Sequence, residues 1–386
     1  MRRSLPIAWL FAAACGTHQV APQPAAHAST DTPMDDATRY EVALQKVFDH
    51  DIDGARADLD TLMRTAAPPV AKQSGELAAQ LMMLQSDWGA LSALAGSGPG
   101  TEFPTMMAAV PAESRILPTE TVTLPVPLSA SGSPMVLTTI NGVERLFFID
   151  TGAGMSVVAS DLAEAAGITR LGGSFDADTT TSQHVATLPS IIDELQFGPV
   201  QFRNHPALII DKDALTFDMG AAGTMKIDGV LGWPVIKHLH LELDYQSQTL
   251  TLHAPDAHRS EVPNLYWVGY PLVDGRSGDV QLRFGLDTGA QDTALDVSFL
   301  EIFHELDAGA VSVRRGGAGG WEDVEARRVE DVHLSLGGTV AHFAELYATQ
   351  ISTIPLLDVQ GIIGSDVAQE RRMIVDYPCG HFALPE

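Results

Sequence analysis

The chain has 386 residues and carries 49 acidic against 23 basic side chains, which gives a formal net charge of −26 at pH 7. A protein this acidic repels phosphate backbones, so we expect no nucleic-acid partner. Hydrophobic residues make up 45% of the chain, which is enough for a large core and excludes wholesale disorder.

The first fifteen residues have the layout of an export signal. Met1-Arg2-Arg3 is positively charged, and the apolar run from Leu5 to Ala14 has signal-peptide length and is too short to span a bilayer. The run ends in Ala12-Ala13-Ala14-Cys15, which resembles a bacterial lipoprotein signal with Ala12 where Leu is usual. The resemblance implies lipidation of Cys15, and the alternative is ordinary cleavage near Ala14. We therefore predict a signal peptide over residues 1–15 and a protein held by lipid in the bacterial cell envelope, on the periplasmic or outer-membrane side.

Three segments precede the main body of the chain. Residues 16–35 are rich in Ala, Pro, Ser and Thr, which predicts a flexible tether. Residues 36–96 place apolar side chains at helical spacing, which predicts a small module of three or four helices packed as hairpins. Residues 97–118 are rich in Gly, Pro and Ser without a period, which predicts a linker. The sequence leaves open whether the helical module is a pro-region, a docking module or a spacer.

From Glu120 onward the chain has short β-branched runs between turn residues, which predicts a mainly β structure. Residues 119–255 and 262–386 repeat the same landmarks in the same order. The run Ile149-Asp150-Thr151-Gly152-Ala153 is echoed by Leu286-Asp287-Thr288-Gly289-Ala290. Downstream, Gly229-Val230-Leu231-Gly232 is echoed by Gly361-Ile362-Ile363-Gly364. The order and spacing of these landmarks indicate an internal duplication into two lobes.

The paired Asp-Thr-Gly-Ala motifs resemble those of the pepsin-like and retropepsin-like aspartic proteases. The resemblance covers residues 120–386 and implies a bilobal fold of two duplicated β-barrel lobes, here preceded by the small α-helical hairpin module. It implies a catalytic dyad of Asp150 and Asp287, one from each lobe. It also implies that the catalytic loops are supported by Thr151, Gly152, Thr288 and Gly289. The glycine strands that begin and end at Gly229, Gly232, Gly361 and Gly364 are expected beneath those loops.

Two adjacent carboxyl groups suit peptide hydrolysis because like charges cannot both ionise at short distance. One group then stays protonated as an acid while the other acts as a base on a water molecule. Such a site requires no metal and no cofactor, and His238 and His240, which we interpret as a strand-surface pair, lack a third ligand nearby in sequence. We therefore predict an exported aspartic endopeptidase, active as a monomer on peptide or protein substrates. The alternative is a catalytically silent peptide-binding or scaffolding envelope lipoprotein.

Two further features bear on this hypothesis. Ala153 and Ala290 stand where pepsins carry a hydroxyl that stabilises the ionised carboxylate, so we expect a working range of about pH 5–7. Aspartic proteases also cover the substrate with a β-hairpin flap. In the first lobe the matching stretch, residues 171–187, lacks the tyrosine expected of pepsin, and in the second lobe residues 314–321 form a glycine-rich tip. The flap candidates are Gly317, Gly319 and Trp321, and a plain solvent-exposed hairpin is the alternative.

Overall fold

The computed structural model describes residues 4–7, 34–96, 101–220, 223–255, 262–351 and 356–386. Cys15, most of the predicted signal peptide and residues 16–33 of the predicted tether lie outside these ranges. Within the leader region, β1 (Ser4–Ile7) pairs in parallel with β20 (Asp307–Gly317). No helix among the described residues is long and apolar enough to cross a bilayer.

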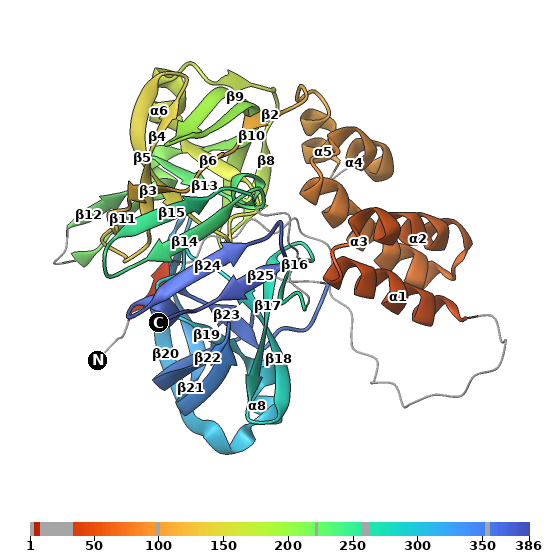
Figure 1. Cartoon of the computed structure of the whole chain (residues 1–386), viewed down its shortest axis with the longest axis vertical. Helices are drawn as coiled ribbons and strands as arrows, with labels where there is room; N and C mark the ends of the chain where they lie inside the picture. Colours follow the sequence, from red (N-terminus) through yellow and green to blue (C-terminus); the bar gives the residue numbers. More distant parts are fainter. Residues whose placement is uncertain (1–3, 8–33, 97–100, 221–222, 256–261, 352–355) are drawn as a thin grey trace.

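Four helices occupy residues 36–95. They are α1 (Asp36–Phe48), α2 (Ile52–Thr65), α3 (Pro68–Leu84) and α4 (Trp88–Ala95). The carboxylates of Asp35, Asp51 and Asp87 accept backbone N–H groups at the starts of α1, α2 and α4, which stabilises these helix termini. Figure 1 shows the helices lying along one side of the β structure.

The helices pack on both halves of the β structure. The buried Lys237 ammonium donates to Leu84 O and to Ser86 Oγ at the end of α3. Near the end of α1, the His50 ring bonds Leu265 O at 2.7 Å, and the Arg283 guanidinium lies 4.4 Å from the Phe48 ring centre. The helical segment is therefore joined to the rest of the protein by buried polar and aromatic contacts.

The predicted linker over residues 97–118 is not irregular throughout. This stretch contains α5 (Glu102–Met107) and β2 (Ser114–Ile116), and Met107 is fully buried. Phe103 packs on Trp88 and on Phe175 of β8 (Phe175–Asp178), with ring centres 6.2 and 5.0 Å away. Elements this short have no detectable period and form because they pack against their neighbours.

The chain is mainly β, which confirms the predicted class. In the first half, the main sheet has the order β2-β10-β6-β13-β5-β4-β9-β7, with β8 paired to β9. Besides β2 and β8, the helices and strands of this half are, in chain order, β3 (Val122–Pro125), β4 (Met135–Ile140), β5 (Val143–Ile149), β6 (Ser156–Ala159), α6 (Ser160–Ala165), β7 (Thr169–Arg170), β9 (His184–Phe197), β10 (Val200–Ile210), η1 (Lys212–Leu215), β11 (Thr216–Asp218), β12 (Thr224–Lys226), β13 (Gly229–Leu231), α7 (Trp233–Ile236), β14 (His240–Asp244) and β15 (Thr249–His253).

The second half has a main sheet of order β1-β20-β21-β22-β19-β23-β18-β17-β16, and β21 also pairs with β17. Besides β20, the helices and strands of this half are, in chain order, β16 (Leu265–Trp267), β17 (Pro271–Ser277), β18 (Val280–Leu286), β19 (Ala294–Asp296), α8 (Val297–Ile302), η3 (His304–Leu306), β21 (Gly320–Leu336), β22 (Thr339–Thr349), β23 (Gly361–Ile363), η4 (Ser365–Ala368), β24 (Arg372–Asp376) and β25 (His381–Ala383). The two halves share a local topology. Strand β13 lies parallel to β5 and antiparallel to β6, and β23 lies parallel to β18 and antiparallel to β19.

A third sheet, of order β25-β24-β14-β15-β3, joins the halves through the antiparallel pair β14 and β24. Figure 1 shows these strands between the two halves. His240 opens β14 opposite His253, whereas His238 lies in the turn after α7, where its ring is 6.1 Å from that of Phe202. The interpretation of His238 and His240 as a pair on one strand face is therefore wrong, because His238 lies in the turn that precedes β14.

Candidate active site

The structure brings Asp150 and Asp287 together at the centre of the molecule. Asp150 follows β5 and Asp287 follows β18, and both side chains are fully buried. Asp150 Oδ1 accepts the N–H groups of Gly152 and Ala153 at 2.9 and 3.1 Å. Asp287 Oδ1 accepts those of Gly289 and Ala290 at 2.9 and 3.0 Å. Each carboxylate is thus fixed in the same way by its own loop.

Two threonines tie the loops to each other. Thr151 N–H donates to Thr288 Oγ1 and Thr288 N–H donates to Thr151 Oγ1, both at 3.0 Å. Each hydroxyl in turn donates across the interface at 2.8 Å, Thr151 to Leu286 O and Thr288 to Ile149 O. These four buried bonds hold the two loops as one rigid unit with local twofold symmetry.

The loop glycines are required for a close approach between the halves. A Cβ on Gly152 would lie 2.5 Å from Asp287 Cγ, and one on Gly289 would lie 2.5 Å from Asp150 Cγ. Neither residue is among those with positive φ. Each glycine therefore makes room for the opposite carboxyl group, which is a different reason from the tight turn that the motif alone would indicate.

The glycine strands β13 and β23 support the loops from below. Asp150 N–H donates to Leu231 O at 3.1 Å, and Asp287 N–H donates to Ile363 O at 2.9 Å. All four glycines at the ends of these strands are too crowded for a side chain. The atom nearest to an added Cβ would be a Phe147 ring carbon at 2.2 Å for Gly229, Met155 O at 2.5 Å for Gly232, Ala294 O at 2.5 Å for Gly361 and Asp292 C at 2.6 Å for Gly364.

Burial makes both carboxyl groups weaker acids than usual. Burial raises the pKa of Asp150 well above its ordinary value, and the neighbouring Asp287 charge raises it further. Burial also raises the pKa of Asp287, to about 6, and interactions with the Asp150 side chain and with the Ala290 N–H limit that rise. The two buried groups therefore hold one proton between them, and this proton belongs to the pair rather than to one residue.

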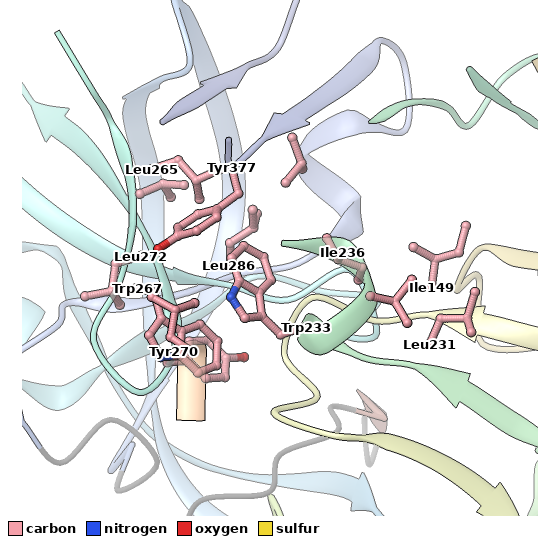
Figure 2. Packing of buried hydrophobic residues seen from close by; sticks show 14 of the residues in the cluster. Ile149, Leu231, Trp233, Ile236, Leu265, Trp267, Tyr270, Leu272, Leu286 and Tyr377 are labelled. Atoms are coloured by element: carbon pink, nitrogen blue, oxygen red, sulfur yellow. The ribbon is translucent and has the colours of Figure 1, made fainter. Parts of the chain in front are cut away.

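Tyr270 reaches the same point and was missed by the sequence argument. It stands just before β17, and only 2% of it is exposed. A Cβ on Gly152 would lie 2.6 Å from the Tyr270 hydroxyl, beside the Asp287 carboxyl carbon. Interaction with this hydroxyl lowers the pKa of Asp287, so Tyr270 supplies a polar group that Ala153 and Ala290 lack. Figure 2 shows Tyr270 beside Trp267 and Trp233, and the rings of these two tryptophans stack at 5.3 Å.

The hairpin tip between β20 and β21 contains Gly317 and Gly319 and leads into Trp321. It docks on the first half, because Gly319 N–H donates to Ala214 O at 3.0 Å. The Trp321 ring meets that of Phe217 edge-on, with centres 6.4 Å apart. The tip residue Ala318 is only 2% exposed and belongs to the same apolar cluster as Ala153, next to the carboxyl pair. The alternative of a solvent-exposed hairpin is therefore wrong for this tip.

The stretch 171–187 of the first half meets that tip. Thr180 Oγ1 donates to Gly316 O at 3.2 Å, and Ser182 N–H donates to Glu322 Oε2 at 2.9 Å. Hairpins from both halves thus converge beside the buried carboxyl pair.

A family comparison covers the first of the two carboxyl loops. Residues 136–235 match the family model for aspartyl proteases. The matched range contains Asp150, its loop and strand β13, whereas Asp287 lies outside it. None of the curated proteins compared with the chain matches it. The mainly β fold and this match support an aspartyl protease relationship and a peptidase activity.

Proposed function

We propose that the chain is an aspartic endopeptidase whose dyad, Asp150 and Asp287, is shared between two lobes. The observation that carries the proposal is the pair of buried carboxyl groups on symmetric loops, linked by the reciprocal Thr151–Thr288 bonds. Within the described part of the chain no cationic side chain pairs with either carboxyl group, and burial of this kind favours one shared proton, which is the state that acid–base hydrolysis needs.

The Tyr270 hydroxyl lies beside the Asp287 carboxyl group and favours its ionised form, which assigns the roles. The ionised Asp287 carboxylate takes a proton from a water molecule as its oxygen bonds to the scissile carbonyl carbon, and protonated Asp150 donates to the carbonyl oxygen. The resulting diol collapses when Asp287 passes its proton to the amide nitrogen, the C–N bond breaks, and Asp150 regains a proton from a diol hydroxyl. Because the pKa of Asp287 is about 6, we expect activity near neutral pH rather than at strongly acidic pH.

The strand edges and the hairpin tip next to the carboxyl pair suit an extended peptide as substrate. An extended peptide between the lobes would pair with strand edges and be covered by the tip at Gly317–Gly319 and Trp321. Since this tip bonds to the first half and the dyad is fully buried, it must move before a substrate can enter. Both aspartates lie on one chain, so the proposed enzyme acts as a monomer.

The test is cleavage of a diverse peptide pool at several pH values, with and without pepstatin. The native chain should cut with subsite preference, and Asp150→Asn and Asp287→Asn should each abolish cleavage while keeping the native circular dichroism spectrum. Asp279→Asn, an exposed acid in the β17–β18 turn, is the matched control and should keep full activity. Full activity of either dyad variant, or an optimum at pH 2–3, would contradict the mechanism.

The closed hairpins and the fully buried carboxyl groups favour a second candidate, a silent peptide-binding or scaffolding protein. Tight peptide binding without cleavage at every pH would support that function instead. Export and a lipid anchor on Cys15 are a separate part of the proposal, supported by the pattern of residues 1–15. Mass spectrometry of the mature N-terminus tests it, and an unmodified Cys15 would contradict it.

A further inference from the structure

A group of three potential metal ligands lies on an exposed face of the second half, on strands β21 and β22. His333 and His342 are directly opposite each other on these antiparallel strands, and their rings stack with centres 4.4 Å apart. Asp331 precedes His333 by two residues, and its Oδ1 lies 3.0 Å from His342 Nε2 and 3.8 Å from His333 Nδ1. One ligand atom from each residue falls within 4.8 Å of the other two.

The backbone at Asp331 is unusual. Its φ is 58°, in the middle of a 17-residue strand. The ladder with β22 is interrupted there, since Glu330 pairs with Glu345 and Val332 with Phe343 while Asp331 itself has no paired residue in the register. Positive φ is uncommon for a residue other than glycine, and such strained positions gather at functional sites. At this position the Asp331 carboxylate lies 3.0 Å from His342 Nε2.

We propose that Asp331, His333 and His342 bind a divalent transition metal ion, with Zn²⁺, Ni²⁺ and Cu²⁺ as the class of ligand. Two imidazoles and one carboxylate suit these borderline ions and not Ca²⁺ or Mg²⁺, which prefer oxygen ligands. Ligand atoms around tetrahedral zinc lie about 3.3 Å apart, because each sits about 2.0–2.2 Å from the ion. The observed separations of 3.0 and 3.8 Å lie on either side of that value.

The surroundings favour a cation. The nearby Arg328 guanidinium is engaged by Glu330 at 3.3 Å and by Glu345 at 3.9 Å, so its charge is balanced by two acids. All three ligand side chains are more than half exposed, which leaves a fourth position open to water. A bound ion would clamp β21 to β22 at the interruption, on the same strand whose other end carries Trp321.

The experiment is calorimetric titration of the purified protein with Zn²⁺, and separately with Mg²⁺, at a pH of about 7.5, where imidazole is mostly neutral. We expect one Zn²⁺ per chain, no Mg²⁺ binding, and a rise in melting temperature with Zn²⁺. His333→Ala and His342→Ala should each weaken Zn²⁺ binding at least about tenfold, and Asp331→Asn should weaken it less because it keeps an oxygen ligand.

Two control variants make the outcome decisive. His184→Ala removes an exposed histidine that pairs with Asp178 at 2.7 Å and has no stacked imidazole among the residues that the structure describes, and it should bind Zn²⁺ as the native chain does. His253→Ala tests the other histidine pair, whose rings lie 4.3 Å apart at His240 and His253. The inference is overturned if Zn²⁺ binding is not saturable, if it survives both the His333 and His342 changes, or if it is lost in His253→Ala. None of these results depends on peptide cleavage.

Discussion

Removal of the Tyr270 hydroxyl should shift the pH dependence of cleavage. Tyr270→Phe keeps the ring that packs beside Trp267 (Figure 2) and takes away only the hydroxyl next to the carboxyl pair. That hydroxyl stabilises ionised Asp287 and is one of the interactions that keep its pKa near 6. Without the hydroxyl, one of the interactions that offset the effect of burial is lost, so the pKa of Asp287 should rise.

The size of the shift follows from the chemistry of the contact. The Tyr270 hydroxyl makes no hydrogen bond of normal geometry to the described residues, so its effect on Asp287 is weaker than that of a hydrogen bond to a charged group, which contributes about 1.5–3 kcal/mol. One pKa unit corresponds to about 1.4 kcal/mol, so an increase of up to about one unit is expected. A higher pKa keeps Asp287 protonated to higher pH. Because the proposed base is ionised Asp287, the acidic limb of the kcat/KM profile should move upward by the same amount.

The assay is the pH profile of kcat/KM with one good peptide from the pool. Tyr377→Phe is the matched control, since it removes another buried hydroxyl from the same aromatic cluster, where Tyr377 meets Trp233 edge-on at 5.1 Å. The control should keep the native profile. An unchanged acidic limb in Tyr270→Phe, or a limb that moves to lower pH, would refute the assignment of Tyr270 to Asp287.

Three other substitutions test separate features. Burial raises the pKa of Asp366 to about 7, so its protonated form contributes stability that is present below about pH 4 and is lost as the pH rises through 7. In urea unfolding, Asp366→Asn should make the free energy of unfolding fall less steeply with pH over this range. An equal fall in both proteins argues against this role of Asp366. Trp321→Ala should loosen the docked tip and lower kcat/KM about tenfold, or about 1.4 kcal/mol, and an unchanged value would show that the tip does not cover substrate. Gly289→Ala would place a Cβ 2.5 Å from Asp150 Cγ and should lower kcat at least about 100-fold, whereas Gly89→Ala, with open space around it, should not.

The sequence was sufficient for the parts of the site that depend on local pattern. Asp150 and Asp287 each end an apolar strand and begin the same motif, so duplication alone predicted that the two loops would be equivalent. The mainly β class followed from strand periodicity. These features are encoded within short windows, where residue spacing and side-chain type carry the information.

The remaining parts depend on contacts between distant segments. Tyr270 lies 17 positions before Asp287, and no motif marks it, because its role comes from the way the chain enters β17. The short elements α5 and β2 are likewise stabilised by packing rather than by their own period. The reason for Gly152 and Gly289 could not be read from the motif either, since it is the proximity of the opposite carboxyl group.

A short chain of hydrogen bonds, here called a relay, lies behind each carboxyl loop in both halves. In the second half Gly364 N–H donates to Thr293 Oγ1, which donates to Asp366 at 2.6 Å. In the first half Gly232 N–H donates to Ser156 Oγ, which lies 2.9 Å from His205 Nε2. The equivalent hydroxyl is therefore held by a carboxylate in one half and by an imidazole in the other.

The relay of the first half, through Ser156 and His205, ends at a residue outside that half. His205 Nδ1 lies 2.7 Å from Glu113, which belongs to the segment between the helices and the β structure, and the His205 side chain is fully buried. The Nδ1–H donates to Glu113, because an ionised carboxylate can only accept a hydrogen bond. The segment before β2 thus completes the support of the Asp150 loop.

The contact between Glu113 and His205 predicts that residues 36–116 stay in the mature folded protein and are not removed as a pro-region. Glu113→Ala leaves the buried His205 Nδ1–H without its acceptor and should lower the free energy of unfolding by about 1–3 kcal/mol, measured with urea. Exposed Glu102 lies in the same segment, so Glu102→Ala is the control and should change it by less than about 0.5 kcal/mol. A double-mutant cycle with His205→Ala should give a coupling of about 0.5–3 kcal/mol. If Glu113→Ala is as stable as the control and the coupling is zero, the relay does not stabilise the protein, and a removable pro-region becomes the better interpretation of residues 36–116.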